Sequence, residues 1–205
     1  MRVVAIDGPT GVGKSTTARA IAEALGVPLL LDPVSTSPLL DEYYNGEANP
    51  DAALASELAF LRLRADLLIG VPGDGIVVSD FSIGRTGPFS EFLDEPSDRA
   101  RVLDEMATLT AAAVPLDVLV LLSAPPDVLI ERVRSRGRGS EDELTIGHLR
   151  ALDGHFRAWQ SAMREQARWS TEIDTRHWDP RRPDDVEALV GQITRALASS
   201  PDAPR

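Results

Sequence analysis

Short apolar runs alternate with longer amphipathic stretches along most of the chain. Four runs, at residues 3–7, 27–31, 76–80 and 116–122, are rich in Val, Ile and Leu, which predicts buried strands. Near-continuous apolarity of this kind is typical of a parallel sheet that helices cover on both faces. A shorter fifth strand is expected at residues 170–174.

Helical spacing dominates the stretches between these strands. At residues 50–70 apolar side chains recur every three or four positions and form one stripe, made of Leu54, Leu58, Leu61, Ala65 and Leu68. The same reasoning predicts further helices at residues 14–25, 38–46, 96–113, from 125 into an arginine-rich segment, 142–168 and 184–198. The alternation predicts an α/β fold with a doubly wound, five-stranded parallel sheet, whose ligands bind beyond the carboxyl ends of the strands.

Length and composition narrow the class of protein. The 205 residues, 43% of them apolar, suit one domain, which we expect at residues 1–198 ahead of a flexible tail at 199–205. The lack of cysteine excludes disulfides and thiolate chemistry and fits a reducing compartment. Met1 and Arg2 lead into the first strand without a secretory pattern, and no apolar run approaches the roughly 18 residues of a membrane helix. We therefore expect a cytoplasmic protein without a membrane partner.

The charge distribution limits the partners that the protein can bind. A formal charge of −11 argues against polymeric nucleic acid as a partner, because most of the surface would repel a polyanion. Any binding site for an anion must therefore be local. Among the 21 basic residues, Lys14 is the one lysine. A lysine supplies a compact, flexible point charge, so Lys14 marks the place where phosphate chemistry is expected.

The strongest motif follows the first predicted strand. Residues 8–15 read GPTGVGKS and satisfy the pattern G-x-x-x-x-G-K-[ST] between a strand and a helix. The backbone N–H groups of such a loop and the helix N-terminus suit the phosphates of ATP. Lys14 is expected to bridge the β- and γ-phosphates, and Ser15 to hold Mg²⁺. The expected nucleotide-binding set is Gly8, Thr10, Gly11, Val12, Gly13, Lys14, Ser15 and Thr16.

Two acidic residues end predicted strands at the same edge as this loop. Asp80 is the last residue of the third predicted strand, where many P-loop proteins carry an acidic residue that organises Mg²⁺ through water; an ordinary helix cap is the alternative. Asp32 follows the second strand, and Pro33 ends that element. ATP and Mg²⁺ are therefore the cofactors that the sequence predicts.

Arginines gather after the helix that Pro125 and Pro126 open. Arg132, Arg134, Arg136 and Arg138 lie within seven residues. On a phosphoryl-transfer enzyme such a cluster acts as a movable clamp that neutralises the transferred group and excludes water. A solvated basic surface is the alternative interpretation. We expect a lid at about residues 132–142.

Six segments stand out along the chain: GPTGVGKST, DPV after the second strand, YY at 43–44, ExxFLxxR at 57–64, VVSDFS at 77–82 and ERVRSRGRGSE at 131–141. In their order and, nearly, in their spacing they resemble the deoxyribonucleoside kinase family of P-loop kinases. The likeness covers about residues 1–160, and the lid segment is its more specific part. It implies a P-loop kinase fold with an arginine-rich lid and ATP-dependent phosphoryl transfer to the 5′-hydroxyl of a nucleoside-like molecule. It also implies a homodimer paired through helices, for which Trp159 and Met163 are candidates, although core packing explains both equally well.

The resemblance implies roles for single residues. At the position of Asp32 the family carries the general base for the sugar hydroxyl, usually a glutamate, so the shorter Asp32 must sit closer or move toward the metal instead. Tyr44 matches the tyrosine that contacts the sugar 3′-hydroxyl, and Glu141 matches its partner in the lid. Plain structural roles are the alternatives for all three. The matching lid arginines, expected to act in catalysis with Lys14, are Arg132, Arg136 and Arg138.

Two positions depart from the family pattern. Glu57 stands where the family commonly has a glutamine that reads the base. Because a carboxylate only accepts hydrogen bonds, Glu57 would suit two donors, such as N1–H and the amino group of guanine. Phe81 stands where the family has an arginine beside the phosphates, a cation that Arg85 or a lid arginine would have to replace. Glu57 and Arg85 complete the expected substrate-binding set with Tyr44 and Glu141.

Two other functions stay open. A nucleoside monophosphate kinase, thymidylate kinase in particular, needs cations for the acceptor phosphate, and Arg62, Arg64 and Arg85 are candidates. A P-loop module that binds nucleotide for regulation or assembly is compatible with Phe81 and Glu57. Preference for a monophosphate over its nucleoside would favour the first, and rapid turnover with any small alcohol would exclude the second.

Overall fold

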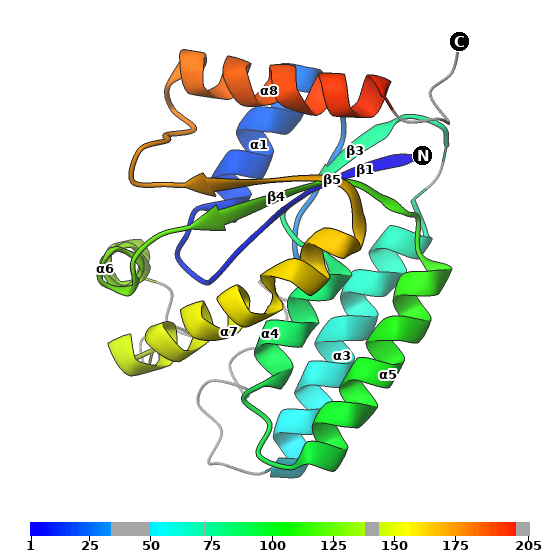
Figure 1. Ribbon diagram of the computed structural model, residues 1–205, viewed down its shortest axis with the longest axis vertical. Coiled ribbons are helices and arrows are strands. Elements are labelled where there is room, and N and C mark those ends of the chain that lie inside the picture. The colour runs from blue at the N-terminus through cyan, green and yellow to red at the C-terminus, as the bar shows by residue number, and fades with distance from the viewer. Residues whose placement is uncertain (34–49, 72, 138–143, 200–205) are drawn as a thin grey trace.

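One parallel sheet forms the centre of the molecule. The structure, a computed structural model, describes residues 1–33, 50–71, 73–137 and 144–199. Within these ranges five strands pair in parallel in the order β2-β3-β1-β4-β5 (Figure 1). Their bounds are β1 (Arg2–Asp7), β2 (Leu29–Leu30), β3 (Ile76–Ser79), β4 (Leu116–Ser123) and β5 (Ala167–Asp174). The order and the pairing confirm the predicted fold class.

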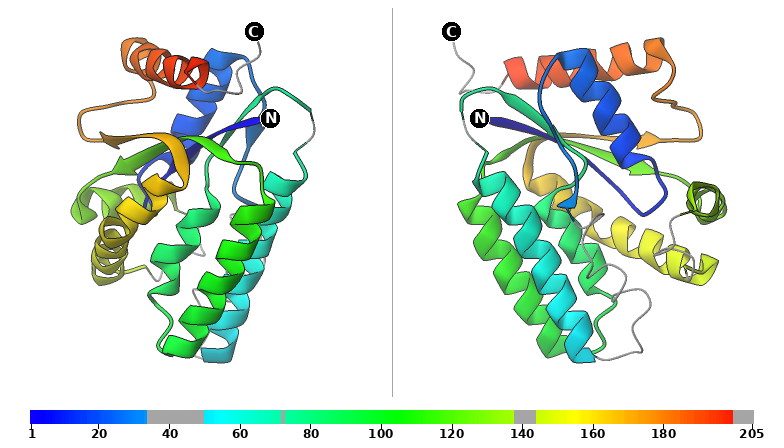
Figure 2. Two further views of the ribbon diagram at one scale, coloured as in Figure 1. Left: turned by 45° about the vertical axis from the view of Figure 1, so that its right-hand side comes forward. Right: turned by 180° about the vertical axis from the view of Figure 1, so that it is seen from behind.

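Helices cover both faces of this sheet (Figures 1 and 2). One face carries α1 (Lys14–Leu25) and α8 (Pro183–Ala198). The other carries α3 (Pro50–Ile69), α4 (Thr86–Ser90) with the 3₁₀ turn η2 (Ile83–Arg85) before it, α5 (Pro96–Ala112) and α7 (Ile146–Glu165). Helix α6 (Pro126–Arg136) lies beyond the carboxyl end of β4. Across the described ranges, no helix combines the length and the apolarity that a bilayer span requires.

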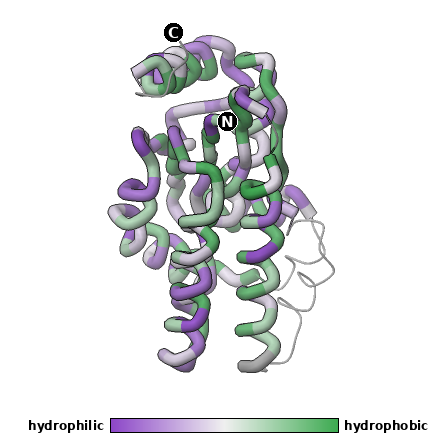
Figure 3. Tube along the Cα trace, turned by 90° about the vertical axis from the view of Figure 1, so that its right-hand side faces the viewer, coloured by the Kyte–Doolittle hydropathy of each residue, from purple (hydrophilic) through white to green (hydrophobic). Residues whose placement is uncertain are grey.

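The predicted stripe on α3 is buried. Leu54, Leu61, Ala65 and Leu68 are at most 7% exposed, and Leu58 is partly buried. Hydrophobic and hydrophilic residues both occur along α3 and α5, as expected for helices with one buried face (Figure 3). Between these helices and the sheet lies what we call the second core, made of Val3, Leu61, Ala65, Leu68, Val77, Phe81, Ile83 and Met106.

The bounds of three elements were predicted wrongly. The second strand spans only Leu29–Leu30 rather than residues 27–31. The helix predicted at 142–168 is α7, which begins after Thr145, whose side chain accepts from the His148 N–H, and ends at Glu165. Strand β5 therefore starts at Ala167 rather than at 170. The error has a physical cause: β5 is an edge strand whose half-exposed, largely polar residues make no apolar run, so the helical pattern was extended into it.

The arginine-rich segment is also more regular than expected. Arg132, Arg134 and Arg136 belong to α6 itself, which ends where Gly137 adopts a φ of 62°. The first part of the predicted lid is thus helical. The helix predicted at 38–46 and, of the tail predicted at 199–205, residues 200–205 lie outside the described residues.

The second core generates a stability prediction. Leu61 is 0% exposed, so Leu61→Ala should lower the free energy of unfolding by about 2–5 kcal/mol through lost burial and the cavity left behind. The matched control is Leu63→Ala on the same helix, 36% exposed, for which less than about 1 kcal/mol is expected. Urea unfolding followed by circular dichroism measures both. Equal losses in the two variants would contradict the assigned packing of α3.

Candidate active site

The loop between β1 and α1 has a backbone that only glycine adopts readily. Gly8, Gly11 and Gly13 have φ values of 143°, 84° and 102°. A Cβ on Gly8 would lie 2.3 Å from the carbonyl oxygen of Leu122, and one on Gly11 would lie 2.8 Å from that of Leu129. The three glycines of the motif are therefore required by this curled conformation, which turns N–H groups toward a ligand.

Lys14 occupies the first turn of α1, and its Nζ donates to the carbonyl oxygen of Pro9 at 3.0 Å. Burial and the nearby cation Arg85 lower the pKa of Lys14 to about 7, although three neighbouring carboxylates oppose the shift. Without a nucleotide, the amine is therefore close to its midpoint at neutral pH. Phosphate oxygens would supply the counter-charge that favours the protonated form.

The predicted metal residues lie together. The hydroxyl of Ser15 donates to Oδ2 of Asp80, and the backbone N–H of Asp32 donates to Oδ1 of Asp80 at 2.5 Å. Asp80 follows β3 and Asp32 follows β2, which is the neighbouring strand. A hydroxyl and a carboxylate in contact are the hard oxygen ligands that Mg²⁺ prefers, so this donor set fits that ion.

Asp7, the last residue of β1, was missed by sequence reasoning. Its carboxylate is 0% exposed and accepts from the Gly8 N–H at 2.7 Å, from the Ser82 N–H at 2.9 Å and from the Ser82 hydroxyl at 2.6 Å. Arg85 Nη1 donates to the same carboxylate at 3.1 Å. The signal available in the sequence was an ionisable residue at the end of an otherwise apolar strand.

Arg85 links this carboxylate to the phosphate loop. Besides Asp7, its Nη1 donates to the carbonyl oxygen of Gly8 at 2.8 Å, and its Nε lies 3.9 Å from Oδ2 of Asp32. The guanidinium stacks over the ring of Phe89, 4.8 Å from the centroid. Arg85, 6% exposed, thus places a cation between the phosphate loop and Asp32. The sequence suggested Arg85 as a replacement for the arginine that the family has at position 81.

The arginines proposed for an acceptor phosphate lie in different places. Arg64 donates through Nε and Nη2 to the carboxylate of Asp32, with three contacts of 3.1–3.3 Å. Arg62, two residues earlier, is exposed and pairs with Glu105 on α5. Phe81, at 0% exposure, packs in the second core rather than beside the loop.

Glu57 lies on α3 two turns before Arg64, and its side chain is 2% exposed. Its charge helps to raise the pKa of Arg64, so the two side chains are within electrostatic reach. Three residues of the predicted acceptor and lid sites, Tyr44, Arg138 and Glu141, lie outside the described ranges.

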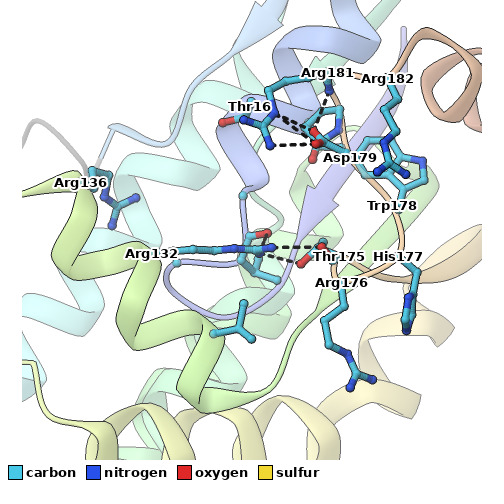
Figure 4. Close-up of a pocket in the computed structure, with 16 residues that line it drawn as sticks. Thr16, Arg132, Arg136, Thr175, Arg176, His177, Trp178, Asp179, Arg181 and Arg182 are labelled. Atoms are coloured by element: carbon cyan, nitrogen blue, oxygen red, sulfur yellow. Dashed lines mark hydrogen bonds and ion pairs between the residues drawn. The ribbon is translucent and has the colours of Figure 1, made fainter.

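A cavity of about 630 Å³ adjoins the phosphate loop (Figure 4). It lies between residues 11–13 of the loop, Thr16 in the first turn of α1, Arg132 and Arg136 of α6, and residues 175–182 after β5. Arg132 Nη1 donates to the Thr175 hydroxyl at 2.8 Å and Nη2 to the Thr175 carbonyl at 3.0 Å. The segment 175–182 was not expected to contribute, because its residues match no motif. Arg132 thereby joins α6 to the strand end on the far side of the cavity.

Comparisons with known proteins agree with this arrangement. The sequence profile of the deoxynucleoside kinase family matches residues 4–196. A deoxyguanosine kinase of Bacillus subtilis is 25% identical over 154 residues, 73% of each chain. An adenylate kinase of Mycolicibacterium vanbaalenii is 30% identical over 149 residues, 71% of this chain and 76% of the relative. In fold, a deoxyadenosine kinase from M. mycoides with dCMP and a flexible dCDP bound has a TM-score of 0.79 at 18% identity, over 95% of this chain and 99% of that one.

The environment of Lys14 generates a prediction on protons. Because the pKa of Lys14 is about 7 and phosphate favours the charged amine, ATP binding at pH 8 should take up close to one proton. At pH 6 the amine is already charged and the uptake should vanish, so affinity should fall as pH rises through 7. Calorimetry in two buffers of different ionisation enthalpy measures the uptake. Lys14→Arg, which stays charged, is the control and should show none; the same uptake in that variant would contradict the assignment.

Proposed function

The chain belongs to the deoxynucleoside kinase family and is an ATP-dependent nucleoside kinase; from that premise we propose that it phosphorylates the 5′-hydroxyl of a (deoxy)nucleoside or a closely related acceptor, with a preference for guanine-type bases. One observation carries the proposal. The hydrogen-bond chain from Ser15 through Asp80 to Asp32 joins the residue proposed to hold Mg²⁺ at the donor phosphates to the residue proposed to meet the acceptor.

The proposed reaction is a single displacement. The acceptor hydroxyl oxygen attacks the γ-phosphorus, the bond from that phosphorus to the β–γ bridging oxygen breaks, and ADP departs. Asp32 accepts the hydroxyl proton, while Lys14 stays on the β- and γ-phosphates of the donor. Mg²⁺, held by Ser15 and through water by Asp80, would neutralise charge on those phosphates. The hydrogen bond from the Asp32 backbone N–H to Asp80 also makes Asp32 a candidate ligand of that ion.

The remaining site residues are proposals of the same kind. Arg132, Arg136 and Arg138 are proposed to close on the donor, and Tyr44 and Glu141 to hold the sugar. Arg132 and Arg136 line the cavity beside the phosphate loop, which supports a role at the donor side. Arg85 supplies the cation that position 81 lacks.

The preference for guanine rests on Glu57. A buried carboxylate on the acceptor side of α3 can accept two hydrogen bonds and donate none. Guanine offers N1–H and an amino group side by side, whereas thymine offers one donor. The similarity to a deoxyguanosine kinase is compatible with this preference.

A nucleoside monophosphate kinase is the alternative, favoured by the 30% identity to adenylate kinases. Such an enzyme needs cations that can receive an acceptor phosphate. Arg62 points away toward Glu105, and Arg64 is bound to Asp32, which leaves Arg85 of the three candidates. This distribution supports a nucleoside as the acceptor.

Two expectations about context are also proposals. We propose a cytoplasmic enzyme and a homodimer. Met163 is 1% exposed in the core, and Trp159 packs partly buried with its Nε1 donating to Glu91 at 2.9 Å. Both side chains serve the fold of one chain, so a dimer would use other helical surfaces.

The test of the proposed function is phosphoryl transfer from ATP and Mg²⁺ to a panel of nucleosides, deoxynucleosides and their monophosphates. We expect turnover with purine nucleosides and a loss of about 10²–10⁴-fold in kcat for Asp32→Asn, which removes the base but keeps the side-chain shape. Asp66→Asn, exposed on α3, is the matched control and should retain full activity. Turnover confined to monophosphates would establish the alternative, and silence across the panel with ATP bound would refute the proposed nucleoside acceptor.

The role of Glu57 can be tested separately. A glutamine accepts and donates, so Glu57→Gln should shift the ratio of kcat/KM for deoxyguanosine over deoxyadenosine by about tenfold or more toward deoxyadenosine. The KM for ATP should stay unchanged, because Glu57 lies on the acceptor side. An unaltered ratio would assign Glu57 a purely structural role.

A further inference from the structure

We propose that Arg64 is a positioning residue for phosphoryl transfer: its guanidinium fixes the plane of the Asp32 carboxylate toward the acceptor hydroxyl. The inference rests on the proposed role of Asp32 as the base. It replaces the other reading of Arg64, as a clamp for an acceptor phosphate, with a role that the observed contacts support.

The contact between the two side chains has fork geometry. Arg64 Nε lies 3.2 Å from Oδ1 and 3.3 Å from Oδ2 of Asp32, and Nη2 lies 3.1 Å from Oδ2. Contacts from two nitrogens to both oxygens define the orientation of the carboxylate plane, which a single contact leaves free to rotate. The side chains are only 5% and 13% exposed, so water competes little for these bonds.

The other degrees of freedom of Asp32 are already fixed. Its backbone N–H is bound to Asp80, which in turn is bound to Ser15 at the start of α1. The position of the Asp32 backbone relative to the donor side is thereby set, and rotation of the side chain is what remains. Arg64 restrains that rotation through its three contacts, whereas Arg85 adds only a longer one, with its Nε 3.9 Å from Oδ2. A base displaced by about 1 Å loses about 10²-fold in rate, so this restraint matters for catalysis.

Helix α3 explains why the cation comes from position 64. The buried face of α3 packs Leu61, Ala65 and Leu68 against Phe81 in the second core, so position 81 is committed to packing. Arg64 lies beside this face at 4% exposure. The same helix therefore supports the aromatic ring at 81 and delivers a guanidinium to the carboxylate after β2.

Arg64 is itself held as a cation. Burial lowers its pKa, but the charge and hydrogen bonds of Asp32, with the charges of Glu57 and Asp7, outweigh that effect and raise the pKa above its ordinary value. The charge of Glu57, two turns away on α3, thus also favours the protonated form of Arg64. A guanidinium committed in this way to carboxylates is poorly placed to receive an acceptor phosphate.

The test is a double-mutant cycle between Arg64 and Asp32, with kcat and both KM values measured for the best acceptor. Arg64→Gln should lower kcat by about 10²-fold and leave the KM for ATP within about twofold. Arg64→Lys keeps the charge without the fork and should also lower kcat, by a smaller factor. Arg62→Gln, two residues away on the exposed side of α3, is the matched control and should be unchanged. Added to Asp32→Asn, the Arg64→Gln change should cost nothing more, because Arg64 acts through Asp32.

The outcomes separate this inference from the proposed function. Full activity in Arg64→Gln, or an additive loss in the double variant, overturns the positioning role while leaving Asp32 as the base. A wild-type kcat in Asp32→Asn would instead overturn the role of Asp32 as the base, and the single variant is enough to show it. If Arg64→Gln fails to fold by circular dichroism, Arg64→Lys carries the test: reduced kcat that is not additive with Asp32→Asn supports the role, and unreduced kcat overturns it.

Discussion

The buried carboxylate of Asp7 is the interaction on which the site depends. A carboxylate with no exposure is tolerated only when hydrogen bonds and an opposite charge replace its water, and Asp7 receives these from Gly8, Ser82 and Arg85. The three partners come from the phosphate loop and from the segment after β3. Satisfying one buried charge thus aligns the phosphate loop with the neighbouring strand end, and it also places Arg85 near Asp32.

The strand order turns this local alignment into a two-sided site. Strand β1 lies between β3 and β4, so the phosphate loop that follows β1 meets different neighbours on its two sides. Toward β3 and β2 lie Asp80, beside Ser15 of the loop, and Asp32, the base proposed for the acceptor hydroxyl. Toward β4 and β5 lie α6 and the segment 175–182, which enclose the cavity beside the loop. The proposed division between a donor side and an acceptor side would therefore follow from the strand order.

Sequence reasoning could predict the parts of the site that depend on local pattern. The glycines of residues 8–13 and the apolar runs of β1, β3 and β4 have short-range signatures, and the structure confirms those elements. The features that sequence reasoning missed depend on contacts between residues far apart in the chain. Nothing near residue 64 reveals that Arg64 reaches Asp32 while Arg62 reaches Glu105, because that difference arises from which face of α3 is buried. Strand β5 was shortened for a related reason, since its register against β4 rather than its own apolarity makes it a strand.

A chain with one lysine has one side-chain amine. Every other basic side chain is a guanidinium or an imidazole, and the amine of Lys14 is nucleophilic near neutral pH because its pKa is about 7. An acylating reagent therefore meets two amines in this sequence, the N-terminus and Lys14. Whatever fills the phosphate loop shields one of them. The extent of acylation at Lys14, measured by mass spectrometry, would therefore report occupancy of the proposed donor site without an engineered probe.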